Sequence, residues 1–207
     1  MMHRTMFKLN QGVYWLFLGM WIGAIVMLIF AAGITFKTVR TFNPTIGIKP
    51  YNHELFSEPQ TQSNIIAGGV TREVLHSLAG IGIVCGSIVL LSLLLQCTVF
   101  SRQLWPNSNK QLGLRCGWLN WFRVIMILLP LTNVAMHFDM ANKMGALQDI
   151  RYNAEQEDSA RAKAQHEFDK LHKKSVRMTS GSLFMLFAAA GISSFVLTRD
   201  PIKDELG

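Results

Sequence analysis

The sequence lacks the local motifs that mark the common catalytic and nucleotide-binding sites. It contains no GxSxG nucleophile turn, no HExxH zinc helix, no P-loop and no GxGxxG dinucleotide motif. No pair of acidic residues lies within its long apolar runs, as a proton relay through a membrane would need. We therefore expect a protein that is not an enzyme and holds no cofactor.

Cysteine is also scarce, with three residues in a chain of 207. Cys85, Cys97 and Cys116 lie inside or at the start of apolar runs, and no CxxC or mixed Cys/His ligand spacing is present. In apolar surroundings free cysteine behaves as a small hydrophobic residue. We interpret all three as buried packing residues that say nothing about redox compartment.

Charge is sparse and unevenly distributed. Charged residues make up 16% of the chain, half of the residues are hydrophobic, and the apolar residues gather in long blocks. A membrane-spanning helix needs about 20 apolar residues to cross ~30 Å of hydrocarbon. Four blocks are long enough, and they predict spans at residues 12–36, 74–100, 117–138 and 178–198. The sequence thus predicts an all-α integral membrane protein with one four-helix domain over residues 1–207.

The first block invites comparison with a signal peptide because Arg4 and Lys8 precede it. It is, however, about twice as long as the apolar region of a secretory signal, and no small-x-small cleavage site stands near its end. We expect it to remain as a transmembrane helix.

The first polar segment breaks every helical pattern. Residues 37–72 contain Pro44, Pro50 and Pro59 together with several Asn, Ser and Thr residues. This composition predicts a polar loop, with a short interfacial piece near residues 51–56.

The second polar segment, residues 139–177, keeps a helical rhythm of apolar positions on both sides of a polar stretch at 153–159. On the far side, Phe168 and Ser175 fall on one stripe and are interpreted as packing residues. We expect the third and fourth helices to continue beyond the bilayer as an antiparallel hairpin. A disordered charged loop is the alternative.

Four residues within the spans carry further expectations. Gly19 and Gly23 form a GxxxG pair, which we interpret as an internal packing face in preference to a dimer contact. Pro130 predicts a kink in the third helix. Arg123 follows two tryptophans near the start of that helix, so we expect it to snorkel to the interface; an intramembrane functional charge is the alternative.

The predicted topology brings three histidines toward one membrane face. His76 lies near the start of the second span, His137 at the end of the third, and His172 just before the fourth. Together they are candidates for a transition-metal site, or two of them for haem iron. A structural polar cluster that joins the helices is the favoured interpretation, because no pair has local ligand spacing.

Three stretches together resemble a family of small four-helix membrane proteins that includes animal transmembrane protein 205 and a bacterial domain of unknown function. They are the first helix with Leu18-Gly19-Met20-Trp21-Ile22-Gly23 and Phe36 at its end, a second helix with His76 at its start, and the run from Phe168 to Ser175 with His172. The resemblance implies a fold and a membrane location but no activity.

The net charge of +7 suits contact with anionic lipid head groups. Cations are spread over every loop and alternate with acids, so nucleic-acid binding is not expected. Four spans place both termini and the short second connection on one face. The raw number of cations favours the two long loops inside. Because the positive-inside rule is most reliable for short loops, we nevertheless expect both termini to be cytoplasmic.

These features favour a non-enzymatic accessory or scaffolding subunit of a larger membrane complex, partnered by the bilayer and by other membrane subunits. The alternative is a small homo-oligomeric membrane protein that binds a metal, haem or small molecule at the histidine cluster.

Overall fold

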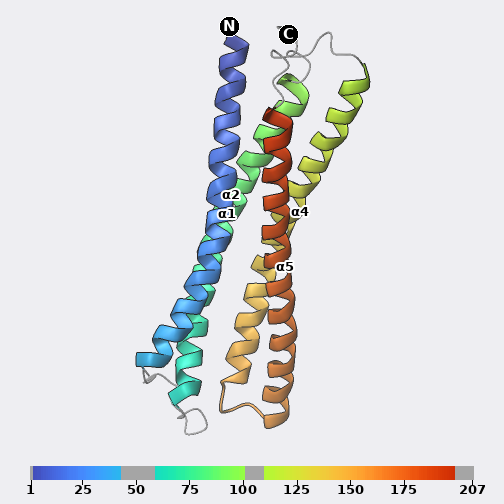
Figure 1. Ribbon diagram of the computed structural model, residues 1–207. Coiled ribbons are helices and arrows are strands. Elements are labelled where there is room, and N and C mark those ends of the chain that lie inside the picture. The colour runs from blue at the N-terminus through green and yellow to red at the C-terminus, as the bar shows by residue number, and fades with distance from the viewer. Residues whose placement is uncertain (1, 43–58, 101–109, 199–207) are drawn as a thin grey trace. The chain divides into compact units, whose positions relative to one another are not determined.

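The computed structural model describes residues 2–42, 59–100 and 110–198, and this part of the chain is all-helical apart from one short connection (Figure 1). The long helices, in chain order, are α1 (Met2–Phe42), α2 (Pro59–Leu95), α4 (Lys110–Arg151) and α5 (Asp158–Thr198). A π-helix, η2 (Gln96–Phe100), continues α2. The prediction of an all-α chain is confirmed for the described residues.

Within the described residues, four helices are long and apolar enough to cross a membrane, as expected of a multi-pass membrane protein. The candidate spans are Thr5–Thr41, Thr61–Thr98, Trp121–Arg151 and Asp158–Ser194. At 1.5 Å per residue the 41 residues of α1 measure about 60 Å, which is about twice the thickness of the hydrocarbon core. The helices are therefore longer than the charge-free runs from which they were predicted.

The predicted loop at residues 37–72 is wrong at both ends. Helix α1 continues to Phe42, and α2 already begins at Pro59, a residue well suited to the first turn because its missing N–H would have no helical partner there. Arg40 and Asn64, both inside the predicted loop, join the two helices: Nε and Nη2 of Arg40 donate to Asn64 Oδ1 at 3.3 and 3.1 Å. Polar composition marked the limit of the apolar run, not the limit of the helix. The interfacial piece expected at residues 51–56 lies outside the described residues.

The chain divides into two compact units. Unit 1 comprises Met1–Gly23, Gly82–Asn133 and Ser180–Gly207, and unit 2 comprises Ala24–Ile81 and Val134–Thr179. The core of unit 1 takes side chains from all four long helices: Tyr14, Leu18, Trp21, Cys85, Val89, Leu93, Val124, Ile127, Leu186 and Ala189. Cys85 is buried as predicted and Cys97 is half-buried; the side chain of Cys116 lies outside the described residues.

The core of unit 2 is smaller and includes Ile65, Ala67, Val134, Met140, Ala141, Tyr152 and Ala164. A six-residue connection, 152–157, joins α4 to α5, close to the turn predicted at 153–159. Asn153 Oδ1 accepts a hydrogen bond from the N–H of Glu155 at 2.9 Å, which closes the turn locally. The expectation that both helices continue on either side of a polar turn is confirmed.

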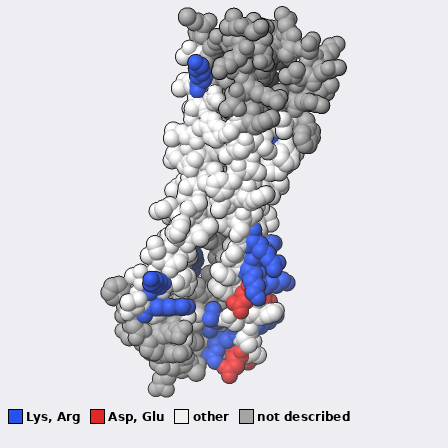
Figure 2. All heavy atoms as spheres, viewed as in Figure 1, with Lys and Arg blue, Asp and Glu red and all other residues white. Residues whose placement is uncertain are grey.

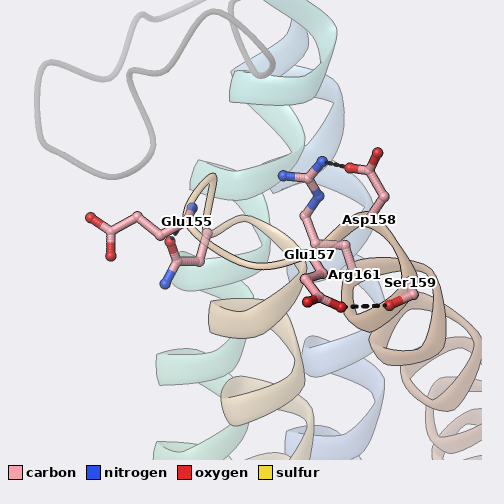
Figure 3. Close-up of polar contacts among 6 residues, drawn as sticks. Glu155, Glu157, Asp158, Ser159 and Arg161 are labelled. Carbon is pink, nitrogen blue, oxygen red and sulfur yellow. Dashed lines mark hydrogen bonds and ion pairs between the residues drawn. The ribbon is translucent and has the colours of Figure 1, made fainter.

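Side-chain contacts also fix the start of α5. Asp158 stands in the first turn, where a negative charge favours the helix dipole, and its carboxylate pairs with Arg161 (Figure 3). The carbonyl of Glu157 accepts the first helical hydrogen bond, from the N–H of Arg161 at 3.0 Å. The helix therefore begins where the sequence offers both an acidic first turn and a cation to pair with it.

The glycines that allow close approach are not the predicted ones. Among the described residues, a Cβ added at Gly19 or Gly23 would meet nothing within 4 Å, so the internal packing face expected there stays a prediction. At Gly86 of α2 an added Cβ would lie 2.8 Å from both Leu131 Cδ1 and Trp21 Cη2. A GxxxG spacing places two glycines on one face of a helix, but it does not show whether that face packs against a neighbouring helix.

Substitution of Gly86 by Val should therefore destabilise the protein by about 1–3 kcal/mol, because the buried Trp21 ring must move. The control is Gly19→Val, which places the same side chain in open space. Thermal unfolding of the detergent-solubilised variants measures the difference, and equal midpoints would contradict the packing role of Gly86.

Candidate functional site

A buried arginine joins all four helices of unit 1. Arg123 of α4 is 1% exposed. Its Nε donates to Ser193 Oγ of α5 at 2.8 Å and its Nη2 donates to Gln96 Oε1 of η2 at 3.3 Å. The guanidinium carbon lies 5.3 Å from the ring centroid of Tyr14 of α1, within cation–π range. We call Arg123, Ser193, Gln96 and Tyr14 the arginine network.

Ser193 is the junction of this network. Its Oγ lies 2.6 Å from the carbonyl oxygen of Ala189, to which it donates, and 2.7 Å from the hydroxyl of Tyr14. A serine hydroxyl has one proton and two acceptor sites. Because the proton is given to Ala189, the hydroxyl of Tyr14 donates to Ser193, and Arg123 Nε fills the second acceptor site. This full complement suits a structural role and leaves no lone pair for nucleophilic chemistry.

The burial of Arg123 differs from the expected snorkelling. A snorkelling cation keeps its charged group in water, whereas here the guanidinium is enclosed by polar and aromatic side chains. The sequence does contain a signal for this arrangement. Tyr14, Gln96 and Ser193 are polar side chains within or at the ends of apolar runs on three helices, but their alignment with Arg123 is visible only in three dimensions.

Two buried side-chain N–H groups in unit 1 have no acceptor among the described residues. They are Nε2 of Gln96 and Nε1 of Trp21. Gln96 is the first residue of the π-helix, a backbone form that is often found at functional positions. The amide that accepts from Arg123 therefore keeps an unused donor in the interior of the protein.

His137 joins α4 to α5 in unit 2. Its Nδ1 lies 3.2 Å from Ser175 Oγ and its Nε2 lies 3.1 Å from Thr179 Oγ1. Both ring nitrogens are thus engaged, one as donor and one as acceptor if the imidazole is neutral. The predicted packing residue Ser175 is buried and serves here as a hydrogen-bond partner. Metal ligation by His137 would require the loss of one of these bonds.

The other two predicted histidines have different surroundings. His76 packs edge-on against Phe138, with ring centroids 5.0 Å apart. His172 is exposed and stacks on Phe168 of the same helix at 6.1 Å. In the part of the chain that the structure describes, no three His, Cys, Asp or Glu side chains are placed to hold a metal ion. The histidines contact apolar or hydroxyl neighbours and do not converge on one centre.

His76 does line a polar cavity of about 500 Å³ in unit 2. The lining residues are Arg72, Glu73 and His76 of α2 and Asn142, Gly145, Ala146 and Asp149 of α4. Gly145 makes room for the cation, since a Cβ there would lie 2.8 Å from Arg72 Nη1. Arg72 Nε also lies 3.6 Å from Glu73 Oε1. A cavity with both signs of charge suits a small polar or zwitterionic group.

Comparisons with protein-family models, with curated proteins and with solved structures find no match to this chain. The resemblance to the transmembrane protein 205 family therefore stays a prediction.

Substitution tests the junction role of Ser193. Ser193→Ala leaves Arg123 Nε and the Tyr14 hydroxyl without their acceptor and should cost about 1–3 kcal/mol. Tyr14→Phe removes one donor and should cost about 1 kcal/mol. The double variant should cost less than the sum, because both changes remove the same bond. Additive losses in detergent unfolding experiments would contradict the network.

His137, which contacts α5, and His172, which lies on α5, provide a second pair of variants. His137→Ala should lower the unfolding free energy by about 1–3 kcal/mol, because the buried hydroxyl of Ser175 and the half-buried hydroxyl of Thr179 lose their partner. His172→Ala, at an exposed position, should change it by no more than about 0.5 kcal/mol. Unfolding midpoints of both variants check this, and a larger loss for His172 would reverse the assignment.

Proposed function

We propose that this chain is a non-enzymatic integral membrane protein that serves as an accessory or scaffolding subunit of a larger membrane complex. The observation that carries the proposal is the continuity of α4 and α5. Each is one unbroken helix that leads from an apolar run into a charged segment, to Arg151 in α4 and from Asp158 in α5. The charged segment would form the extramembrane antiparallel hairpin at 139–177 and offer a polar docking surface.

Contacts within unit 2 support such a hairpin. The guanidinium carbon of Arg151 lies 4.5 Å from the ring centroid of Tyr152 and 5.9 Å from that of Phe168 on α5. Tyr152 is 5% exposed and packs with Ile65 of α2 and with Ala154. Burial raises the pKa of the Tyr152 phenol, partly offset by the Arg151 charge, so the ring stays neutral at physiological pH. The predicted packing residue Phe168 thus contributes to the contact between α4 and α5.

The outer face of this segment is charged. Figure 2 shows that acidic and basic side chains lie close together in part of the visible surface. Exposed charges on α5 include Lys163 and Glu167, and Glu155 and Glu157 are exposed in the connection. Exposed charges of both signs contribute little to stability, but they set the specificity of docking.

The native particle provides the direct test. After extraction of the full chain from its own membrane in mild detergent, we expect a particle far larger than 23.3 kDa that contains other polypeptides. Exchange of Lys163 and Glu167 keeps the net charge and the i,i+4 pair but reverses the surface pattern. This variant should stay in the membrane and lose its partners, whereas the control Phe184→Leu, at an exposed apolar position, should keep them.

A particle of one or a few copies would reject this proposal. It would favour the alternative, a small homo-oligomer that binds a small molecule, for which the cavity beside His76 is the supporting observation. His76→Ala should then remove a ligand signal without loss of helicity.

The proposed orientation places both termini in the cytoplasm and the connection between α4 and α5 outside. In a variant whose three native cysteines are replaced by Ala, Glu155→Cys should react with a membrane-impermeant maleimide added to intact cells, because Glu155 is exposed. A cysteine introduced at Lys8, on the other side, is the control and should react only after lysis. The reverse pattern would invert the orientation.

A further inference from the structure

A cluster of unneutralised cations lies on α5 directly before its charge-free run. Lys170, Lys173, Lys174 and Arg177 are all exposed. At 3.6 residues per turn, their spacing of three, four and seven positions places them within an arc of about 100°. Ser175, between them in sequence, is buried against His137. We call these four residues the basic face, and it points away from α4.

In the described part of α5, the ion pairs found do not join Glu167 or Asp169 to these four cations. No acidic residue occurs from Lys170 to Arg177. Asp169 Oδ2 accepts a hydrogen bond from Gln165 at 2.9 Å.

The facing helices show the same pattern. Asp139, which lies near the level of Ser175 because His137 contacts that residue, pairs with Lys143 at 2.7 Å. On α2, Glu73 pairs with Arg72. In the described residues, none of these ion pairs uses a cation of the basic face, so its charge stays available to a partner.

The depth of the basic face matches the lipid head groups. Arg177 is followed by 21 residues without charge, 178–198. Lys170 is seven residues further out, which is about 10 Å along the helix. The head-group layer is about 5–8 Å thick on each side, and lysine and arginine side chains reach several ångströms toward it. All four cations can therefore reach phosphates at the edge of the hydrocarbon.

We propose that the basic face of α5 binds the head groups of anionic phospholipids. A basic cluster that adjoins a transmembrane segment meets such lipids without any further partner, and each cation near the surface strengthens the interaction about fivefold. An acidic protein would need to approach within the same layer, so the position of the cluster favours lipid. The surface is independent of the proposed subunit role, because it needs only this chain and a bilayer.

The experiment uses the full chain reconstituted into phosphatidylcholine vesicles. Electron paramagnetic resonance gives the relative association constant of spin-labelled phosphatidylserine over spin-labelled phosphatidylcholine. We expect a ratio above one at low salt that falls toward one in about 1 M salt, where the screening length is about 3 Å.

Two double variants of α5 make the test specific. Lys173→Gln/Lys174→Gln removes two cations and should lower the ratio by up to about 25-fold, or to one where the starting ratio is smaller. The matched control Arg161→Gln/Lys163→Gln removes the same charge at least about 15 Å further from the charge-free run and should leave the ratio unchanged. Circular dichroism confirms that both variants keep their helicity.

Three results would overturn the proposal. One is a ratio of one for the unaltered chain at low salt. Another is an equal fall in both double variants, which would indicate an effect of net charge alone. The third is binding of polyglutamate that is lost in Lys173→Gln/Lys174→Gln, together with no preference for phosphatidylserine. That result would assign the basic face to an acidic protein. Where lipid binding holds, the Glu155 labelling result identifies the leaflet that must contain the anionic lipid.

Discussion

A buried guanidinium sets the strictest constraint on this fold. A charge removed from water must be compensated by close polar contacts, because the effective penalty of burial is several kcal/mol. Arg123 obtains that compensation from Ser193, Gln96 and the ring of Tyr14. Since these three residues belong to α5, η2 and α1, one side chain of α4 determines which residues of unit 1 must meet. A lysine would not replace it, because it lacks the planar fork that reaches two acceptors at once.

Unit 2 relies on weaker contacts of several kinds. His137 bridges two hydroxyls, Arg151 lies over two aromatic rings, and Gly145 lets the side chain of Arg72 cross α4. In a bilayer the hydrophobic effect does not draw helices together, so close contact and interhelical hydrogen bonds must do so. In unit 1 the polar contacts between helices converge on the charge of Arg123. In unit 2 they are made by separate neutral groups and surface cations. Loss of a single contact should therefore matter more in unit 1.

The sequence predicts the number and type of helices well, because length and apolar content are one-dimensional properties. The four helices, the turn near 153–159 and the helical continuation of residues 139–177 are examples. Helix ends are harder to predict, as the loop at 37–72 shows, because a polar residue can extend a helix beyond the hydrocarbon. Contacts between helices are harder to predict than helix ends. Among the described residues, a Cβ added at Gly19 or Gly23 meets nothing within 4 Å, whereas Gly86, which has the same GxxxG spacing with Gly82, lies against Trp21 and Leu131.

The same limit applies to the polar residues. A histidine or arginine in an apolar run has the same sequence signature whether it binds a ligand or holds helices together. The structure separates these roles by hydrogen-bond capacity. Ser193 and His137 have every site filled, so a ligand could bind them only by displacing a helix contact. This saturation supports a structural role for both side chains, which is what the proposed scaffolding function requires of them.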